Sequence, residues 1–544
     1  MAYNADSAAL YGSLYHYPAA DHPVGTMHQI YDWDTGKHLG EIPEVAHTYN
    51  VVGNINEFGL SIGETTYGGV GALQEQDGAI MDYGSLIWVT LQRAKTAREA
   101  IEVAADLMAT YGYASEGESF SIIDNNEAWV MELIGKGNYE KGAVWVARKL
   151  PQDAVSAHAN QARITTFPQD SPEECLFSKD VVSFAKDIGL YPKDASDADF
   201  SFSDVYDAVT FSGARFCDAR VWSFFGDIMG EEWADQYLDY AMGANLTNRM
   251  PLWVSPPAKV SATDVMGHMR NHYENTKLSM DGMEFPDVGA TYEAVPVRAH
   301  PLTWTDSKGE EYLHERPIAT QQTGWNFVAQ SRSWMPKELS GLLWFGVDDS
   351  ATTVRFPVYG SVTRVPIAFA GKGAQDGVTP PMMEFDDERA FDVFNLMANW
   401  VYSRWDLMYP EVLNTIKSME GTYKEEVNRV DMEASSVYAS QGAAAAVEMA
   451  TQYTEKAGNS LVKSWRKYFG QMFVKYRDGY VITESPEETS CGCSVASAAY
   501  PQQWYDRIAT ETGDHYKVLP DTVSADLKDS RFKPKSKLEL LKRK

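Results

Sequence analysis

Cysteines and long apolar segments are scarce in this 544-residue sequence. Its four cysteines, Cys175, Cys217, Cys491 and Cys493, are too few for a disulfide-stabilised scaffold of this length. No apolar run reaches the ~18 residues that a transmembrane helix needs, so no membrane span is predicted. The length is ample for a large hydrophobic core, and we expect a folded globular protein of about one to three domains.

Positive charge is also scarce. The sequence has 47 Lys and Arg residues against 76 Asp and Glu residues, which gives a formal net charge of -29. Nucleic acids and anionic membranes bind surfaces rich in Lys and Arg, so the composition argues against both as partners. It favours a cationic or zwitterionic ligand.

Several common catalytic and binding motifs are absent. The sequence has no G-x-x-x-x-G-K-[ST] phosphate loop, no convincing G-x-G-x-x-G after a strand and no G-x-S-x-G hydrolase elbow. His268 and His272 are four residues apart on a predicted helix, but no third metal ligand is evident, so a packing or surface role is favoured. Cys491 and Cys493 form a lone C-x-C pair, for which inert thiols are favoured over a metal or redox site. Cys217 is interpreted as a buried structural thiol.

The order of the predicted elements favours a layered α+β fold. Segments such as "MHQIYDW" and "HTYNVVGNI" have the composition of strands, and Gly59 suits the positive-φ position of a tight turn. Asp82, and Thr96 with Glu99, are start signals for two consecutive helices. "ESFSIIDNNEAWVMELIG" is typical of a β-hairpin, and strands return within 319–370. Strands, a helix pair and further strands indicate α+β layers rather than a doubly wound sheet.

We expect three regions along the chain. Residues 1–385 are predicted to form the catalytic layered domain, and residues 386–480 to form two or three long helices packed on it. Residues 481–544 are predicted to be an irregular extension, which ends in the basic tail "KDSRFKPKSKLELLKRK".

A scattered set of polar residues lies on the predicted β segments. Its members are Asn4, Asp6, Asn56, Asn160, Arg215 and Arg220. Asn and Asp favour turns, and the two arginines can pair with local acids such as Asp218. The residue types alone leave structural and catalytic roles open.

Seven ordered blocks carry a resemblance to a known family. They are "YNADSAALYGSLYHYPAADHPVGT", "EIPEVAHTYNVVGNINEFGLSIGETTYGG", "DYGSLIWVTLQRAKTAREAI", "GESFSIIDNNEAWVMELIGKG", "SAHANQARI", "RFCDARVWSFF" and "MRNHYENT". From residue 3 to about residue 480 the chain resembles the N-terminal-nucleophile cysteine dipeptidases, of the dipeptidase A type related to the secernins. The resemblance implies a four-layer αββα sandwich, the N-terminal-nucleophile hydrolase fold, with a helical C-terminal region. It also implies dipeptide cleavage without a cofactor, in which an N-terminal cysteine thiol attacks the carbonyl and its own α-amino group is the base.

The resemblance also assigns roles to single residues. Asp6 matches an aspartate that holds the nucleophile's α-amino group, while Tyr3 stands where arginine is common. Asn160 matches an asparagine that donates to the oxyanion, a contact that contributes ~3 kcal/mol in known oxyanion holes. Arg215 matches an arginine that supports the nucleophile, with Arg220 as the second choice. The residues predicted to contact substrate are Asn4, Glu64, Thr65 and Thr66.

The start of the sequence departs from the family pattern. In the family a Cys-Thr start precedes the Asn-x-Asp turn by about one β-hairpin, roughly 10–20 residues, whereas the first cysteine here is Cys175. We therefore expect this sequence to lack the nucleophile strand, through a start assigned too late or a natural truncation, and the loss of a central strand predicts poor stability.

Two hypotheses follow for the function. The chain is either a dipeptidase recorded without its nucleophile, or a catalytically inactive homologue that binds peptides or has a structural role. A metallopeptidase that uses His268 and His272 ranks below both. A homo-oligomer is compatible with the sequence.

Overall fold

The structure is a computed structural model that describes residues 1–7, 10–279, 303–313, 315–371, 380–485, 492–500 and 502–518. This part of the chain contains both helices and strands, which confirms the α+β class expected from the order of the elements. No helix within the described residues combines the length and apolarity that crossing a bilayer requires.

The larger sheet has eight antiparallel strands in the order β14-β12-β11-β10-β9-β8-β7-β2. Their bounds are β2 His16–Tyr17, β7 Val51–Val52, β8 Ile55–Asn56, β9 Ser61–Tyr67, β10 Gly117–Ile123, β11 Ala128–Gly135, β12 Ala143–Lys149 and β14 Cys175–Phe177. The predicted hairpin is confirmed as β10 and β11. The predicted turn is confirmed between β8 and β9, where Gly59 has a φ of 78°, a conformation that glycine adopts without steric cost.

The smaller sheet has four antiparallel strands in the order β1-β18-β19-β20. Their bounds are β1 Ala2–Asp6, β18 Thr323–Ser331, β19 Gly341–Val347 and β20 Phe356–Tyr359. The first strand pairs with β18, although the two lie more than 300 residues apart in sequence. A register shift between Ala5 and Asp6 interrupts this pairing, and such a bulge re-aims the side chain that follows it.

Five two-stranded pairs complete the β structure of the described residues. They are β3 Ala20–Asp21 with β6 His47–Thr48, β4 Met27–Tyr31 with β5 His38–Pro43, β13 Val155–Ser156 with β15 Trp253–Val254, β16 Thr303–Thr305 with β17 Glu311–Leu313, and β21 Tyr480–Glu484 with β22 Cys493–Ser497.

Twelve α-helices are present within the described residues. They are α1 Tyr83–Arg93, α2 Ala97–Tyr111, α3 Val181–Asp187, α4 Phe202–Tyr206, α5 Ala219–Met229, α6 Glu231–Gln236, α7 Leu238–Ala241, α8 Ala262–His268, α9 Ala390–Tyr402, α10 Trp405–Gln441, α11 Ala443–Tyr476 and α12 Gln502–Thr512. A short π-helix, η3 Gly213–Asp218, runs directly into α5.

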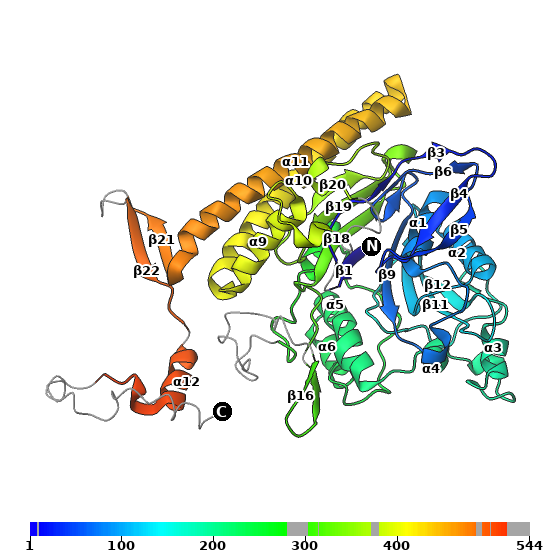
Figure 1. The fold of residues 1–544 in the computed structure, drawn as a ribbon, viewed down its shortest axis with the longest axis horizontal. Helices are drawn as coiled ribbons and strands as arrows, with labels where there is room; N and C mark the ends of the chain where they lie inside the picture. The colour runs from blue at the N-terminus through cyan, green and yellow to red at the C-terminus, as the bar shows by residue number, and fades with distance from the viewer. Residues whose placement is uncertain are drawn as a thin grey trace.

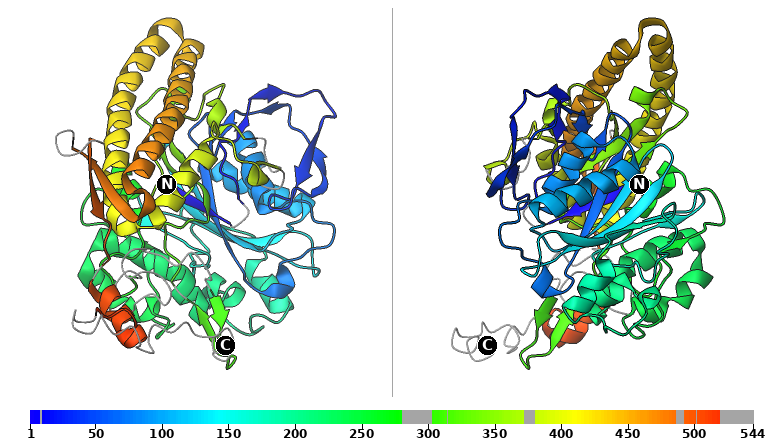
Figure 2. Two further views of the ribbon diagram at one scale, coloured as in Figure 1. Left: turned by 60° about the vertical axis from the view of Figure 1, so that its left-hand side comes forward. Right: turned by 90° about the vertical axis from the view of Figure 1, so that its right-hand side faces the viewer.

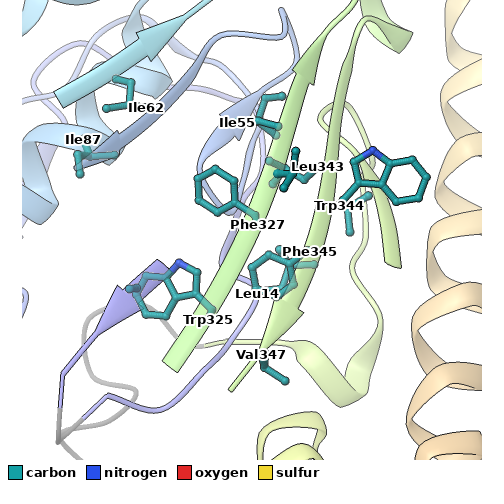
Figure 3. Packing of buried hydrophobic residues seen from close by; sticks show 14 of the residues in the cluster. Leu14, Ile55, Ile62, Ile87, Trp325, Phe327, Leu343, Trp344, Phe345 and Val347 are labelled. Carbon is teal, nitrogen blue, oxygen red and sulfur yellow. The ribbon is translucent and has the colours of Figure 1, made fainter. Parts of the chain in front are cut away.

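The two sheets lie against each other, and helices cover their outer faces (Figure 1). Helices α1 and α2 contact the larger sheet, while α9, α10 and α11 contact the smaller one. Side chains alternate between the faces of a strand, so Leu343 of β19 points toward Ile55 of the larger sheet while Trp344 points toward the long helices (Figure 3). Both sides of the smaller sheet therefore contribute to one large buried core.

The two predicted helix starts are confirmed. Asp82 caps α1 by accepting a hydrogen bond from the Ser85 N–H, and Thr96 caps α2 by accepting one from the Glu99 N–H. In a capping box the Glu99 carboxylate would accept from the N–H of the cap residue Thr96. Here it accepts instead from the N–H of Lys95, one residue before the cap. The two helices hold strands β7 to β12 from outside.

The long C-terminal helices were also predicted and are confirmed as α9, α10 and α11. Helices α10 and α11 form a long antiparallel pair that projects past the smaller sheet (Figure 2). They reverse direction at Gly442, which has a φ of 91°. Asp431 of α10 accepts hydrogen bonds from Tyr359 of β20 at 2.8 Å and from Arg332 at 2.7 Å. The boundaries 1–385, 386–480 and 481–544 stay predictions; the described part of the last region holds β21, β22 and α12.

The predicted helix around His268 and His272 is shorter than expected. It ends at His268, and the chain then takes positive φ values at Tyr273 and Asn275, 65° and 61°, which a right-handed helix does not allow. His268 contacts Asp227, whereas His272 is buried against Tyr402. The expectation that one helix carries both histidines is wrong. The described residues hold no cluster of three or more His, Cys, Asp or Glu able to bind a metal ion.

The expectation that Cys491 and Cys493 are inert thiols is wrong for Cys493. Cys493 is disulfide-bonded, so it is not an inert free thiol. Cys491 lies outside the described residues. Cys175 and Cys217 are free.

Asp348, in the turn after β19, is expected to make the stability of the fold depend on pH. Its Oδ1 accepts from Asn395 at 3.1 Å, and its Oδ2 is buried without a hydrogen-bond partner among the described residues. Burial, followed by the neighbouring charge of Asp349, raises the pKa of Asp348 to about 8. The folded state therefore retains a proton that the unfolded state has lost above pH 4, so this group makes stability fall as pH rises toward 8.

Replacing this residue by its amide, Asp348→Asn, should remove that contribution. Between pH 6.5 and 8.5 the wild type should lose about 1–2 kcal/mol of unfolding free energy relative to the variant, because Asn does not titrate and tolerates the φ of 68° at this position. Thermal unfolding at both pH values measures this, with the exposed Asp153→Asn as a control that keeps the wild-type pH dependence. Equal pH dependence in Asp348→Asn and wild type would contradict the assignment.

Candidate active site

Two adjoining cavities meet between the sheets at the end of β1. One has a volume of about 360 Å³ and we call it the polar cavity. The other, the apolar cavity, has a volume of about 350 Å³. They share the lining residues Tyr3, Asn4, Asp6, Glu64, Thr65 and Arg220. Six of the seven residues predicted for the site lie in these walls, and the exception is Arg215.

Asp6 stands at the centre of this boundary. The hydroxyl of Thr323 donates to its Oδ1 at 2.7 Å, and the Arg316 guanidinium lies 3.5 Å from its Oδ2. Burial raises the pKa of Asp6, while Arg316, the Thr323 hydrogen bond and the charge of Arg220 oppose the rise. The arrangement fixes a carboxyl group in a buried position where it can accept a hydrogen bond from an amine.

Asn160 lines the polar cavity from the turn after β13. Its backbone has a φ of 58°, a conformation in which Asn is more common than most residues. Its Nδ2 donates to the Thr66 carbonyl at 2.5 Å, and its Oδ1 accepts from Arg220 at 2.9 Å. The amide is therefore held at both ends, and one N–H hydrogen remains for a ligand, because Nδ2 has two hydrogens and one acceptor among the described residues.

The two candidate arginines are placed differently. Arg220 lies on α5, lines both cavities and contacts Asn160. Arg215 lies one turn earlier on the π-helix and forms an ion pair with Glu315; among the described residues it lines neither cavity. The structure therefore places Arg220 beside the other site residues, whereas the resemblance had favoured Arg215 for this role.

Glu64 belongs to a buried network that reaches across two strands. The Tyr3 hydroxyl donates to Glu64, and Glu64 in turn is hydrogen-bonded to Glu118 on β10. Thr66 donates to Glu118 at 2.6 Å. Burial is the largest cause that raises the pKa of both glutamates, and the rise is greater for Glu118. Burial therefore favours the protonated form of both carboxyl groups, and Tyr3 supplies a hydroxyl donor at the position where arginine is common in the family.

His158 lines the apolar cavity and was not singled out from the sequence. Its Nδ1 lies 2.7 Å from the Thr65 hydroxyl and its Nε2 lies 2.7 Å from the Ser121 hydroxyl. Burial, with a smaller effect of the Arg163 charge, lowers the pKa of His158 to about 4. The ring is therefore neutral near pH 7. Only the pairing of β9 with β10 brings the two hydroxyls together, so the sequence offered no signal for this contact.

The two free thiols lie away from the cavity walls. Burial raises the pKa of Cys175 to about 11. Burial also raises the pKa of Cys217, although Arg220 and Arg316 oppose that rise. Neither thiol lines either cavity within the described residues, and neither has the lowered pKa of an activated nucleophile.

Comparison with known proteins identifies the family of this chain. Residues 4–418 match peptidase family C69. Because this match covers well over half of the chain, the chain belongs to peptidase family C69, which confirms the family inferred from the ordered blocks.

Individual relatives carry dipeptidase names. A probable dipeptidase of Salmonella dublin is 29% identical over 252 residues, which is 45% of this chain and 52% of that protein. Dipeptidase A of Lactobacillus helveticus is 23% identical over 303 residues, 55% of this chain and 53% of that protein. Probable dipeptidase B of Streptococcus pyogenes serotype M1 is 22% identical over 429 residues, 74% of this chain and 76% of that protein. The match to the first two relatives spans about half of their length.

Proposed function

We propose that the two cavities form the substrate site of a dipeptidase-type hydrolase with a thiol nucleophile. The observation that carries the proposal is the convergence of Asp6, Asn160 and Arg220 from three separate elements in a chain of peptidase family C69. We also infer that the two sheets and their helix layers correspond to the αββα sandwich of N-terminal-nucleophile hydrolases.

Each of the three residues has a role in this proposal. Asp6 accepts a hydrogen bond from the amine that serves as the base and so orients it. Asn160 donates its remaining N–H hydrogen to the oxygen that becomes negative during attack. Arg220 holds the Asn160 amide by its Oδ1. This role differs from the one that the resemblance assigned to Arg215, with Arg220 as the second choice, which is to support the nucleophile. Asn4, Glu64, Thr65 and Thr66 contact the substrate along the cavity walls.

A second candidate function is a catalytically inactive homologue that binds peptides. The observation that favours it is the position of Cys175 and Cys217 outside both cavity walls. Such a protein would retain the same binding residues and release dipeptides unchanged.

The substitution Asp6→Asn separates these functions. Asn keeps the acceptor for Thr323 but removes the charge, so we expect dipeptide hydrolysis to fall by about 100-fold or more without loss of the fold. The protein is expressed from its own reading frame, with any residues that precede Met1, and products are followed by mass spectrometry. The exposed Asp153→Asn is the matched control and should keep wild-type activity.

Three results are informative. Hydrolysis that depends on Asp6 supports the dipeptidase. Dipeptide binding by the wild type without hydrolysis supports the second candidate. Hydrolysis that is unchanged in Asp6→Asn would contradict the placement of the site.

A further inference from the structure

We propose that the apolar cavity is a specificity subsite for a large apolar side chain of the peptide substrate. This inference rests on the proposed function, since it names the substrate class of the same site. It predicts that dipeptides with a residue such as Leu or Phe are preferred over those with Gly or Lys.

The charges of the site are distributed unevenly between the two cavities. The charged side chains in the wall of the apolar cavity are Asp6, Glu64 and Arg220, and all three lie on the boundary shared with the polar cavity. The polar cavity adds Asp34 and Arg316. The charged termini of a dipeptide therefore have partners on the boundary and in the polar cavity, but not in the remainder of the apolar wall.

Apolar side chains from several elements make up that remainder. Val221 and Phe224 come from α5, Val265 from α8 and Trp129 from β11, and Ile318 belongs to the same wall. Cavities of ~300–1,000 Å³ with mainly apolar walls and a few polar groups are typical of small-molecule sites, and the volume here is about 350 Å³. The cavity shares the lining residues Ile123 and Leu150 with a wider hollow of about 1110 Å³.

Beyond the shared boundary, the polar side chains in the apolar wall do not offer a charge to a ligand. His158 is neutral, and both of its ring nitrogens are engaged by Thr65 and Ser121. A Lys or Glu side chain placed here would lose its hydration without gaining a charged partner, which is costly. An apolar side chain would instead gain from leaving water. Because the cavity joins the catalytic boundary at Asp6, a side chain that enters it belongs to a substrate whose backbone lies beside Asp6.

The experiment compares kcat/KM for leucyl-leucine, glycyl-glycine and lysyl-lysine. We expect leucyl-leucine to be preferred at least about tenfold over both others, because one methylene group alone is worth about 10- to 200-fold in an apolar pocket. Val265→Glu, at a half-buried position, should lower kcat/KM for leucyl-leucine about tenfold or more and raise it for lysyl-lysine. Phe224→Ala should weaken leucyl-leucine without improving lysyl-lysine. Phe211→Ala, at an exposed position, is the control and should match wild type.

Equilibrium binding of the same three dipeptides, measured by calorimetry, separates this inference from the proposed function. Turnover with no preference among the dipeptides, unchanged in Val265→Glu, overturns the subsite and leaves the dipeptidase standing. Selective binding of leucyl-leucine that Val265→Glu abolishes, without turnover, supports the subsite and overturns hydrolysis. Absence of binding and turnover overturns both.

Discussion

Replacing Asn160 by alanine is expected to lower kcat for dipeptide hydrolysis by about 100- to 1,000-fold, with a much smaller change in KM. The Nδ2 of Asn160 is held by the Thr66 carbonyl and its Oδ1 by Arg220, so its free N–H needs no reorganisation when charge develops on the substrate. A donor that is already oriented stabilises the transition state more than the ground state. Its loss therefore appears in kcat rather than in binding.

A second variant separates the lost hydrogen bond from backbone strain. Alanine is unfavourable at the φ of 58° that Asn160 adopts, whereas Asn160→Gly removes the same amide without that cost. Both variants should lose activity to a similar degree, and Asn428→Ala, on the exposed side of α10, should not. Activity retained in Asn160→Gly but lost in Asn160→Ala would show that the backbone, and not the amide, matters at this position.

Glu420→Ala is expected to lower the free energy of unfolding by about 3–5 kcal/mol, the usual cost of leaving a buried charge without its partner. Its Oε1 accepts from the Arg270 guanidinium at 2.6 Å and from the Arg355 backbone N–H at 3.0 Å. Both arginines are buried, and burial, followed by the charge of Arg270, lowers the pKa of Arg355 to about 9. The variant would leave two buried cations close together without their carboxylate.

The matched control lies on the same helix. Glu425→Ala changes an exposed position of α10 and should stay within about 0.5 kcal/mol of wild type. Urea unfolding followed by tryptophan fluorescence and by circular dichroism compares the three proteins. Equal midpoints for Glu420→Ala and Glu425→Ala would contradict the view that this contact fastens α10 to the smaller sheet.

The helix caps and the tight turn were predictable from the sequence, because they depend on residues that are close together along the chain. Asp82 and Thr96 cap helices by accepting from a backbone N–H three residues later, and Gly59 forms a tight turn. These roles involve only nearby residues, so they follow from residue type and spacing. The ordered blocks also identified the family. Asp6 and Asn160 were singled out by the same resemblance, and the structure places both in the wall of one cavity.

Contacts between distant segments were not predictable in this way. Thr323 and Arg316, which hold Asp6, lie more than 300 residues from it in sequence. The π-helix before α5 shifts the helical register by about one residue relative to an α-helix, and spacing alone did not show that Arg220 rather than Arg215 would face the cavity. These placements are set by sheet pairing and packing rather than by local sequence.

The most direct test of the account is a crystal structure of Asn160→Gly with leucyl-leucine bound. We predict that the dipeptide backbone lies beside Asp6 at the boundary of the two cavities, with one leucine side chain among Val221, Phe224 and Val265. A dipeptide bound elsewhere, with both cavities free of it, would contradict the account.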